Sequence, residues 1–462
     1  MKYEIRIEGN AVDLKAGTGY ELEMYNPVFD YERPPGARAV DIVLAGESVN
    51  NKRILGFPNN PMVRDAKNLY YCEKSLNGNL IEKGYLRLKE AKDDFKMDFV
   101  TNLLQFFGEY QQMKLSEIDL GKLPLPANWN TTVLNSWNAG GYVLPKILND
   151  TFYASNPPGG WTGVVNDYSG GSYTDGVKVP MFFLKYILKK IGDLAGVTYT
   201  GEYWNSVMAD STIIYNTRAM TGLTEIDIRK HLPDLTVGGF IMALRKLYNL
   251  ALFFDVKRKR LRMDFAKNIW TGETTIDWSS KVGKIMRGTP VVTAGLELAF
   301  TLDNGDGLSK DEFFASLIPE GGDSVKVATA FSTLKMEDGN LVAKQNGITP
   351  EQADKQFGAR LLYSTGVATA DNAIGGVAIK WAGADGLFDN YWKEEDVFRK
   401  SGFVIEELMA LNSYDIARMG AIFRGERNEL PKVHIQGVNY IIEKITVPTD
   451  SPKASLVRAW RV

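Results

Sequence analysis

The chain has 462 residues, 44% of them hydrophobic and 24% charged, and a formal net charge of −2. This composition is typical of a globular protein, and the length indicates several domains rather than a single core. A charge so close to zero excludes a global field that would hold nucleic acid or an anionic membrane. A single cysteine excludes an internal disulfide framework and a thiolate zinc site. With two histidines in the whole sequence, a Ser-His-Asp triad is not favoured.

The start of the chain predicts a strand rather than a targeting segment. Residues 1–8 alternate between apolar and polar side chains and contain no apolar core of a signal peptide. No apolar run in the sequence approaches the length that spans a membrane. We therefore expect no signal peptide, no membrane partner, and a chain that is made in a cytoplasm.

The first hundred residues predict a small antiparallel barrel or sandwich. Asn77-Gly78 separates two alternating segments and is the strongest short hairpin signal in this half of the chain. The segments that predict strands are residues 3–7, 20–25, 39–44, 67–74, 80–88 and 95–100. A short helix is predicted to follow over residues 101–110, where leucine and phenylalanine form an apolar face.

The character of the sequence changes between residues 123 and 178. Tryptophans stand there among Asn, Gly, Ser, Thr and Pro, which indicates long loops in an inserted domain. Pro180 is then predicted to open a helix that ends before Gly196. The apolar face of this helix comprises Phe182, Phe183, Tyr186, Ile187 and Leu194.

The second half of the chain predicts further helices and hairpins. A helix follows Asp234 or Thr236, either of which can cap it, and a hairpin follows over residues 252–265 with four cations in its turn. Helices are also predicted over residues 351–363, after Thr349-Pro350, and from Asp385 or Gly386 to residue 399. The chain closes with a hairpin around Gln436-Gly437 and a last strand over residues 454–462.

The order of these pieces resembles that of tail-tip or baseplate-hub proteins in phages and prophages of Bacteroidetes-type bacteria. Apolar patterns carry the resemblance, and they cover most of the chain. The matching stretches are residues 52–57, 114–120, 180–188, 235–265, 386–392, 412–416 and the final hairpin.

The resemblance implies a β-rich α+β fold with two tail-tube-like antiparallel β-barrel domains and inserted α+β domains. The predicted boundaries are 1–115 for the first barrel, 116–235 for an inserted domain with aromatic loops, 236–345 for a helix and hairpin of the second barrel region, and 346–462 for a C-terminal segment that ends in barrel strands. It also implies a homotrimeric ring in a virion tail, assembled in the bacterial cytoplasm, that joins the tail tube to a spike or fibre.

One acidic turn is similar to a calcium-binding loop. Residues 303–312 read Asp-Asn-Gly-Asp-Gly-Leu-Ser-Lys-Asp-Glu, so Asp303, Asp306 and Glu312 are the candidate metal ligands. Gly307 fits the sharp turn of such a loop, but the first ligand position falls on Leu302 and Glu312 comes one residue early. We therefore favour an acidic turn between a strand and a helix, with no metal and no cofactor.

Three other groups of residues are candidate contact sites. The basic turn 257–260 favours a solvated or protein-facing hairpin tip over a nucleic-acid site. Aromatic loop residues can stack on sugar rings, but Trp and Tyr are also enriched at protein interfaces, which we favour. The candidate interface residues are Trp129, Trp137 and Trp161 in the loops, and Tyr391 and Trp392 in the predicted aromatic helix.

No set of residues in the sequence forms a recognisable catalytic group. The carboxylates Glu394, Glu395 and Asp396, and the pair Glu406 and Glu407, are adjacent in sequence and are predicted to point apart on solvated faces. We expect a non-enzymatic, structural tail component. The alternatives are a tail-associated cell-wall hydrolase, and a carbohydrate-binding adhesin that uses the aromatic loops 126–174.

Overall fold

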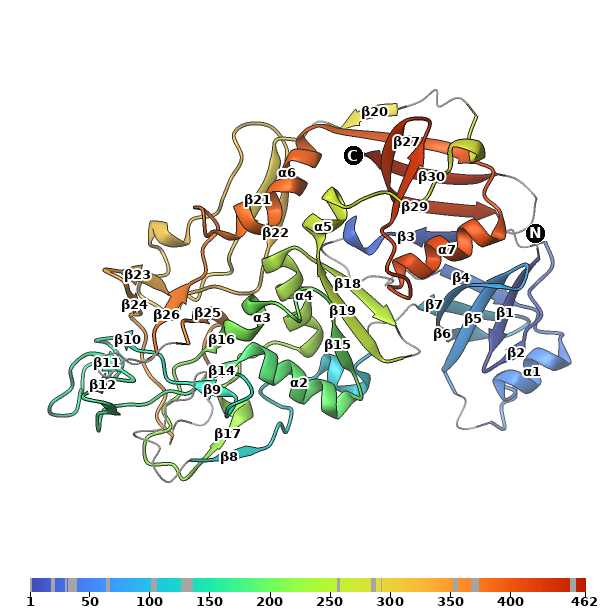
Figure 1. The fold of residues 1–462 in the computed structure, drawn as a ribbon. Helices are drawn as coiled ribbons and strands as arrows, with labels where there is room; N and C mark the ends of the chain where they lie inside the picture. The colour runs from blue at the N-terminus through green and yellow to red at the C-terminus, as the bar shows by residue number, and fades with distance from the viewer. Residues whose placement is uncertain are drawn as a thin grey trace.

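The computed structural model describes residues 2–17, 21–29, 31, 40–63, 67–100, 106–125, 136–255, 258–283, 288–291, 293–350, 352, 356–366, 374–448 and 454–462. Within this part the chain is rich in β-strands and carries several helices, which is the predicted α+β class. Figure 1 shows two β-sheets on one side of the molecule, built from the two ends of the chain, and a mixed block of helices and strands on the other side.

The N-terminal sheet is antiparallel and curls on itself. Its strands run in the order β2-β1-β5-β6-β7-β4. Leu14 forms a bridge to Leu44, so the segment after β2 connects the two ends of the sheet. The strands are β1 (Tyr3–Ile7), β2 (Asn10–Ala11), β4 (Val40–Leu44), β5 (Leu69–Leu76), β6 (Asn79–Ala91) and β7 (Phe95–Val100).

The predicted hairpin at Asn77-Gly78 is confirmed. Leu76 pairs with Asn79 across the turn, and Asn77 and Gly78 have φ angles of 47° and 79°. Two residues with positive φ form the tight turn that matches the twist of an antiparallel pair, and Asn-Gly adopts it at little cost. The short helix α1 (Val49–Leu55) covers one end of this sheet, where the Tyr70 hydroxyl donates to the Leu55 carbonyl at 2.8 Å.

The C-terminal sheet joins the last strands of the chain with one strand from its beginning. The order is β20-β27-β30-β29-β28, and β3 also pairs with β29. The strands are β3 (Glu21–Tyr25), β20 (Gly288–Val291), β27 (Gly402–Met409), β28 (Lys432–Ile435), β29 (Val438–Pro448) and β30 (Ser455–Arg461). The predicted turn at Gln436-Gly437 is confirmed, with φ angles of 49° and 88°.

The prediction that residues 20–25 belong to the N-terminal barrel is wrong. Strand β3 places Met24 opposite Ile445 of β29. The reason is burial, because Leu22 and Met24 alternate into the core of the C-terminal sheet rather than into the N-terminal one. The beginning of the chain therefore ties the two sheets together.

Helix α7 (Ser413–Phe423) packs between the two sheets (Figure 1). A capping box at Asn412 and Asp415 starts it, and its apolar face enters the core of the C-terminal sheet. At its other side, Ser413 accepts a hydrogen bond of 3.0 Å from the Asn79 side chain. Gly420 is required here, because a Cβ atom would lie 2.8 Å from the carbonyl oxygen of Ile81.

The largest core lies in the middle of the chain around α4 (Val237–Tyr248). Thr236 caps this helix as predicted, since its hydroxyl accepts from the Gly239 N–H at 3.1 Å. The predicted hairpin is confirmed as β18 (Leu250–Asp255) and β19 (Arg260–Phe265), and β15 (Thr198–Thr200) extends it in parallel. The surrounding helices are α2 (Leu184–Ala195), α3 (Val207–Ser211) and α5 (Ala266–Thr271), with the one-turn helices η1 (Pro27–Phe29), η3 (Gly108–Gln112), η4 (Ile228–His231) and η5 (Ser279–Lys281).

Small sheets form the remainder of this block. A five-stranded sheet has the order β26-β25-β16-β14-β9, and a four-stranded sheet has the order β11-β10-β24-β23. The pairs β12–β13, β17–β8 and β21–β22 complete it. The strands are β8 (Lys122–Pro124), β9 (Tyr142–Val143), β10 (Ile147–Leu148), β11 (Val164–Val165), β12 (Tyr168–Ser169), β13 (Ser172–Tyr173), β14 (Met181–Phe183), β16 (Thr212–Tyr215), β17 (Glu225–Asp227), β21 (Gly295–Ala299), β22 (Ser324–Ala328), β23 (Lys335–Glu337), β24 (Asn340–Val342), β25 (Arg360–Ser364) and β26 (Gly376–Ala378).

Two helix predictions are wrong in this sheet. Residues 360–363 belong to strand β25, which pairs on both sides, with β16 and with β26. Residues 181–183 form strand β14, so the helix predicted from Pro180 begins at Leu184 instead. Both segments are short apolar runs buried on both faces, and such runs do not show the alternation that marks a half-exposed strand. Leu194, predicted on the apolar face of α2, is 45% exposed.

Candidate functional site

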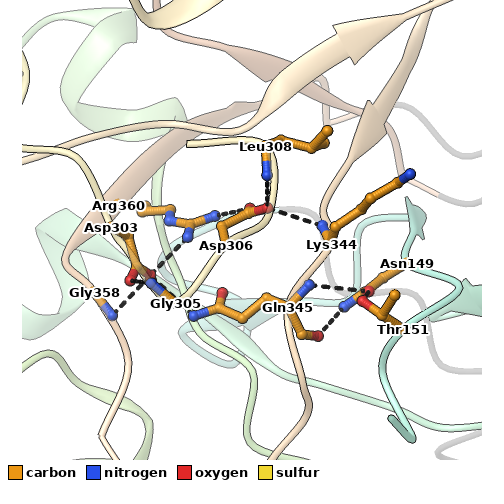
Figure 2. A network of polar contacts seen from close by, with 10 residues as sticks. All are labelled: Asn149, Thr151, Asp303, Gly305, Asp306, Leu308, Lys344, Gln345, Gly358 and Arg360. Carbon is orange, nitrogen blue, oxygen red and sulfur yellow. Dashed lines mark hydrogen bonds and ion pairs between the residues drawn. The ribbon is translucent and has the colours of Figure 1, made fainter. Parts of the chain in front are cut away.

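The acidic turn that is similar to a calcium loop is part of a buried ion-pair network (Figure 2). Asp303 and Asp306 each accept from the Arg360 guanidinium, Asp303 Oδ2 from Nη2 at 2.6 Å and Asp306 Oδ2 from Nη1 at 2.6 Å. Arg360 comes from β25, the strand that the sequence predicted as a helix. The Arg360 side chain is 2% exposed and Asp306 is 3% exposed, so one buried guanidinium is shared by two carboxylates inside the molecule.

Hydrogen bonds satisfy the remaining carboxylate lone pairs. Asp303 accepts from the Gly358 N–H at 3.1 Å and from the Gln345 side-chain amide at 2.9 Å. Asp306 accepts from the Leu308 and Lys344 N–H groups at 2.9 and 3.0 Å. The turn is thereby attached to β25 and to the segment after β24, two segments that are distant from it in sequence (Figure 2).

The surroundings of Asp303 favour its ionised form. Burial by itself would raise the pKa of Asp303, but the Arg360 charge and the donated hydrogen bonds hold that pKa below its usual value. Glu312 lies apart from this network, exposed at the start of η6 (Glu312–Phe314), where Asp311 caps the turn. Over the described part of the chain, no group of three or more His, Cys, Asp or Glu side chains could hold a metal ion.

The cations of the basic hairpin turn contact the protein. Lys257 lies outside the described residues. Arg258 and Arg260 approach the buried Asp255 carboxylate at 3.2 and 3.6 Å. The Lys259 ammonium donates to the Phe106 carbonyl at 2.9 Å. The cations of this turn therefore contact groups of their own chain, as in the protein-facing alternative that the sequence offers for the turn.

The candidate aromatic residues of the loops pack beneath the loops themselves. Trp161 lies edge-on to Tyr153 with ring centroids 5.0 Å apart, and both pack on the core around the four- and five-stranded sheets. Trp137 is partly buried, with the Lys185 ammonium 5.0 Å from its ring centroid. Trp129 lies outside the described residues. Both described tryptophans therefore pack against the same core of their own chain.

Tyr391 and Trp392 lie in the core of their own chain. They end the π-helix η7 (Phe388–Trp392), which leads into α6 (Lys393–Lys400). Trp392 has an exposed fraction of 0%, and its indole N–H donates to the Leu247 carbonyl at 3.3 Å. Tyr391 stacks on Phe265 with ring centroids 5.1 Å apart. Side chains so placed join α6 to the central core, and they offer no surface to another subunit.

The helix that follows contradicts the prediction of a solvated acidic face. Glu394 is exposed as predicted, but Glu395 and Asp396 are buried. Glu395 binds the Arg399 guanidinium at 2.8 Å and the Asn249 side-chain amide at 3.0 Å, and burial raises its pKa. Asp396 accepts from the Leu296 N–H at 2.8 Å and pairs with Lys400. Both carboxylates therefore fix α6 against its neighbours.

The histidines and the cysteine are placed as structural residues. His231 is buried beside Asn216, with 3.2 Å between the ring Nδ1 and the amide oxygen, and burial lowers its pKa to about 3. His434 in β28 contacts Asn439 across the closing hairpin at 3.0 Å. Cys72 is buried in the N-terminal sheet, and burial raises the pKa of its thiol to about 12. A thiol with so high a pKa does not ionise at neutral pH.

Strand β20 forms one edge of the C-terminal sheet. It pairs with β27 on one side, and no other described strand pairs with its second side. Gly288, Thr289 and Pro290 are exposed there. Proline is tolerated on edge strands because it has no N–H to donate, and it limits accidental pairing. The second side of β20 is therefore an exposed strand edge among the described residues.

Comparisons with known proteins give structural similarity only. No protein-family model matches the chain, and no curated protein matches it. The 43 kDa tail protein of prophage MuSo2 from Shewanella oneidensis is 10% identical, with a TM-score of 0.37 and coverage of 100% of this chain and 96% of that chain. Prophage tail protein gp18 from Listeria monocytogenes EGD-e is 6% identical, with a TM-score of 0.37 and coverage of 100% and 94%.

A third solved structure of a tail protein, from Neisseria meningitidis MC58, is 9% identical, with a TM-score of 0.33 and coverage of 100% of this chain and 96% of that chain. Among the described helices, none is long and apolar enough to cross a membrane.

Proposed function

We propose that the chain is a structural component of a phage or prophage tail, a baseplate hub or tail tip that links the tail tube to a spike or fibre. One observation carries the proposal. The two ends of the chain build two adjacent sheets, while the middle of the chain forms an α+β block beside them (Figure 1). This arrangement supports the proposal, because the resemblance implies β-domains with inserted α+β domains.

The two sheets are suited to act as one mechanical unit. Strand β3 from the N-terminal part pairs with β29, and helix α7 contacts both sheets through Ser413 and Gly420. A load on one sheet would then pass to the other through the contacts of α7 and the segment after it with β6. The exposed edge at β20 can pair with a strand of the next subunit, and a ring covers edges that are a liability in a monomer.

The proposed assembly is a homotrimer, and light scattering of the purified chain tests it. A mass of three chains at micromolar concentration is expected. A single-chain mass up to the highest attainable concentration would contradict it. The variant Thr289→Pro, which alters the exposed edge of β20, should reduce the fraction of trimer. A substitution on the buried face of the same sheet would instead reduce the stability of the folded chain.

Two alternative functions, a cell-wall hydrolase and a carbohydrate-binding adhesin, predict experimental results that differ from those of a structural hub. A cell-wall hydrolase would clear peptidoglycan in a zymogram and would lose this activity on substitution of a single carboxylate. An adhesin that uses the aromatic loops would bind a glycan array and lose binding in a Trp161→Ala variant. We expect neither peptidoglycan clearing nor glycan binding.

A further inference from the structure

Two exposed apolar surfaces, one beside the N-terminal sheet and one on the C-terminal sheet, remain without a role in the chain. The first, the α1 tip, comprises residues 52–63 at the end of α1 and in the following loop. It exposes Phe57 by 45%, Met62 by 86% and Val63 by 36%. The second, the β27 face, is formed by Glu406 and Leu408 of β27 with Leu456 and Arg458 opposite them in β30. Leu408 is 63% exposed.

The α1 tip is held in one conformation although its apolar side chains face solvent. Gly56 and Phe57 both have positive φ angles, 74° and 56°, and the Phe57 N–H donates to the Lys52 carbonyl at 2.8 Å. Asn60 then fixes the loop, accepting from the Met62 N–H at 3.0 Å. A non-glycine residue in the left-handed region is strained, and such strain is retained where the surrounding structure over-determines it. A loop ordered in advance loses little entropy when it binds.

The two surfaces are complementary in charge. The α1 tip contains the cations Lys52 and Arg53 and no acidic residue. On the β27 face, one guanidinium serves two carboxylates, because Arg458 lies 2.8 Å from Glu443 and 3.4 Å from Glu406. In the neighbouring strand, Lys444 stands opposite Arg458 and pairs with Glu23. Three carboxylates and two cations therefore leave one negative charge beside an exposed leucine. Paired surfaces with opposite charge and apolar centres favour one orientation of docking.

The fold prevents these two surfaces from meeting within one chain. The α1 tip lies at the beginning of β5, where Tyr70 contacts Leu55. The β27 face is close in sequence to Ser413, which contacts Asn79 beyond the opposite end of β5. Contact between the surfaces therefore requires two molecules.

We propose that the α1 tip of one copy docks on the β27 face of a second copy of this chain. The contact is head-to-tail, so it repeats from copy to copy and closes into a ring when the rotation between copies allows closure. The inference rests on the proposed function, because it names the surfaces that would join the subunits of the hub. Met62 and Phe57 would bury against Leu408 and Leu456, with Arg53 facing Glu406.

A charge exchange in the full-length chain tests this contact by sedimentation velocity over a range of concentrations. Arg53→Glu and Glu406→Lys should each weaken self-association roughly tenfold, and the double variant should recover most of it. Met62→Asp should weaken association at least as much, since it places a charge in the apolar centre. Lys310→Glu is the matched control for Arg53→Glu, because it changes the net charge by the same amount at an exposed position outside both surfaces.

The outcomes separate this contact from the hub itself. Recovery in the double variant supports the contact. Association that is unchanged by the three variants overturns the contact and leaves the proposed hub intact. Absence of self-association in the unaltered chain overturns both. Binding of the chain to vesicles of phosphatidylcholine and phosphatidylglycerol, lost in Met62→Asp while self-association is unchanged, would assign the α1 tip to lipid and overturn the contact.

Discussion

Replacement of Arg360 by methionine is expected to destabilise the fold more than any surface charge change. The guanidinium is 2% exposed and holds two carboxylates at 2.6 Å each, and Tyr215 lies beneath it with 5.3 Å between guanidinium and ring centroid. Removing one member of a buried ion pair leaves an uncompensated charge, which costs about 3–5 kcal/mol in free energy of unfolding at neutral pH. The hydrogen bonds to Asp303 and Asp306 from backbone N–H groups remain, so the lower half of this range is expected.

The pH dependence of this destabilisation distinguishes a charge effect from a packing effect. In the unaltered chain, the depressed pKa of Asp303 means that its contribution to stability is present above the unfolded-state value and is lost as pH falls through the folded-state value. In the Arg360→Met variant, burial without a cation raises the carboxylate pKa values instead. The loss of stability of the Arg360→Met variant, relative to the unaltered chain, should therefore decrease from pH 7 to pH 5, as the two carboxylates take up protons.

Urea unfolding followed by circular dichroism measures both quantities, with hydrogen exchange of residues 303–308 as the local readout. The control is Arg427→Met, which removes a half-exposed ion pair with Glu429 and should cost about 0–1 kcal/mol. The triple variant Asp303→Asn, Asp306→Asn and Arg360→Met removes all three charges and should be more stable than Arg360→Met alone. A loss below 1 kcal/mol for Arg360→Met, or a loss independent of pH, would refute this reasoning.

Three further outcomes are expected. His231 stays neutral in the folded chain because burial lowers its pKa to about 3, whereas the unfolded chain binds a proton near the ordinary pKa. The stability of the fold should therefore decrease as the pH drops below about 6.5. His231→Gln should reduce this decrease, measured as the difference between the urea midpoints at pH 4.5 and 7.5. Trp392→Ala should cost about 3–5 kcal/mol in the same assay, against about 1 kcal/mol or less for exposed Leu408→Ala. Cys72 should resist iodoacetamide at pH 8 in the folded chain and react once urea unfolds it, and rapid modification without denaturant would contradict its burial.

The parts of the fold that could be predicted from the sequence are those set by short-range rules. Asn77-Gly78 and Gln436-Gly437 each place a glycine second in a two-residue turn with positive φ, and both form hairpins. Thr236 caps α4 for an equally local reason. The segment β3 looks like any other alternating strand, and its pairing with β29 depends on residues 420 positions later in the chain. No local pattern contains that information.

The buried charges were missed for a related reason. Arg360, Glu395 and Asp396 lie in segments whose composition predicts solvated faces, and their burial depends on partners supplied by distant strands and helices. A signal was present for Arg360, which stands directly before the apolar residues Leu361 and Leu362. A charged residue adjoining a doubly buried strand needs a counter-charge, and the acidic turn at Asp303 and Asp306 was the available one.

Electron microscopy of the purified chain tests the hub proposal most directly. Closed rings with three-fold symmetry at micromolar concentration are the predicted result. A field of single chains, or open filaments that never close, would contradict the proposal that this chain forms a ring between the tail tube and a spike or fibre.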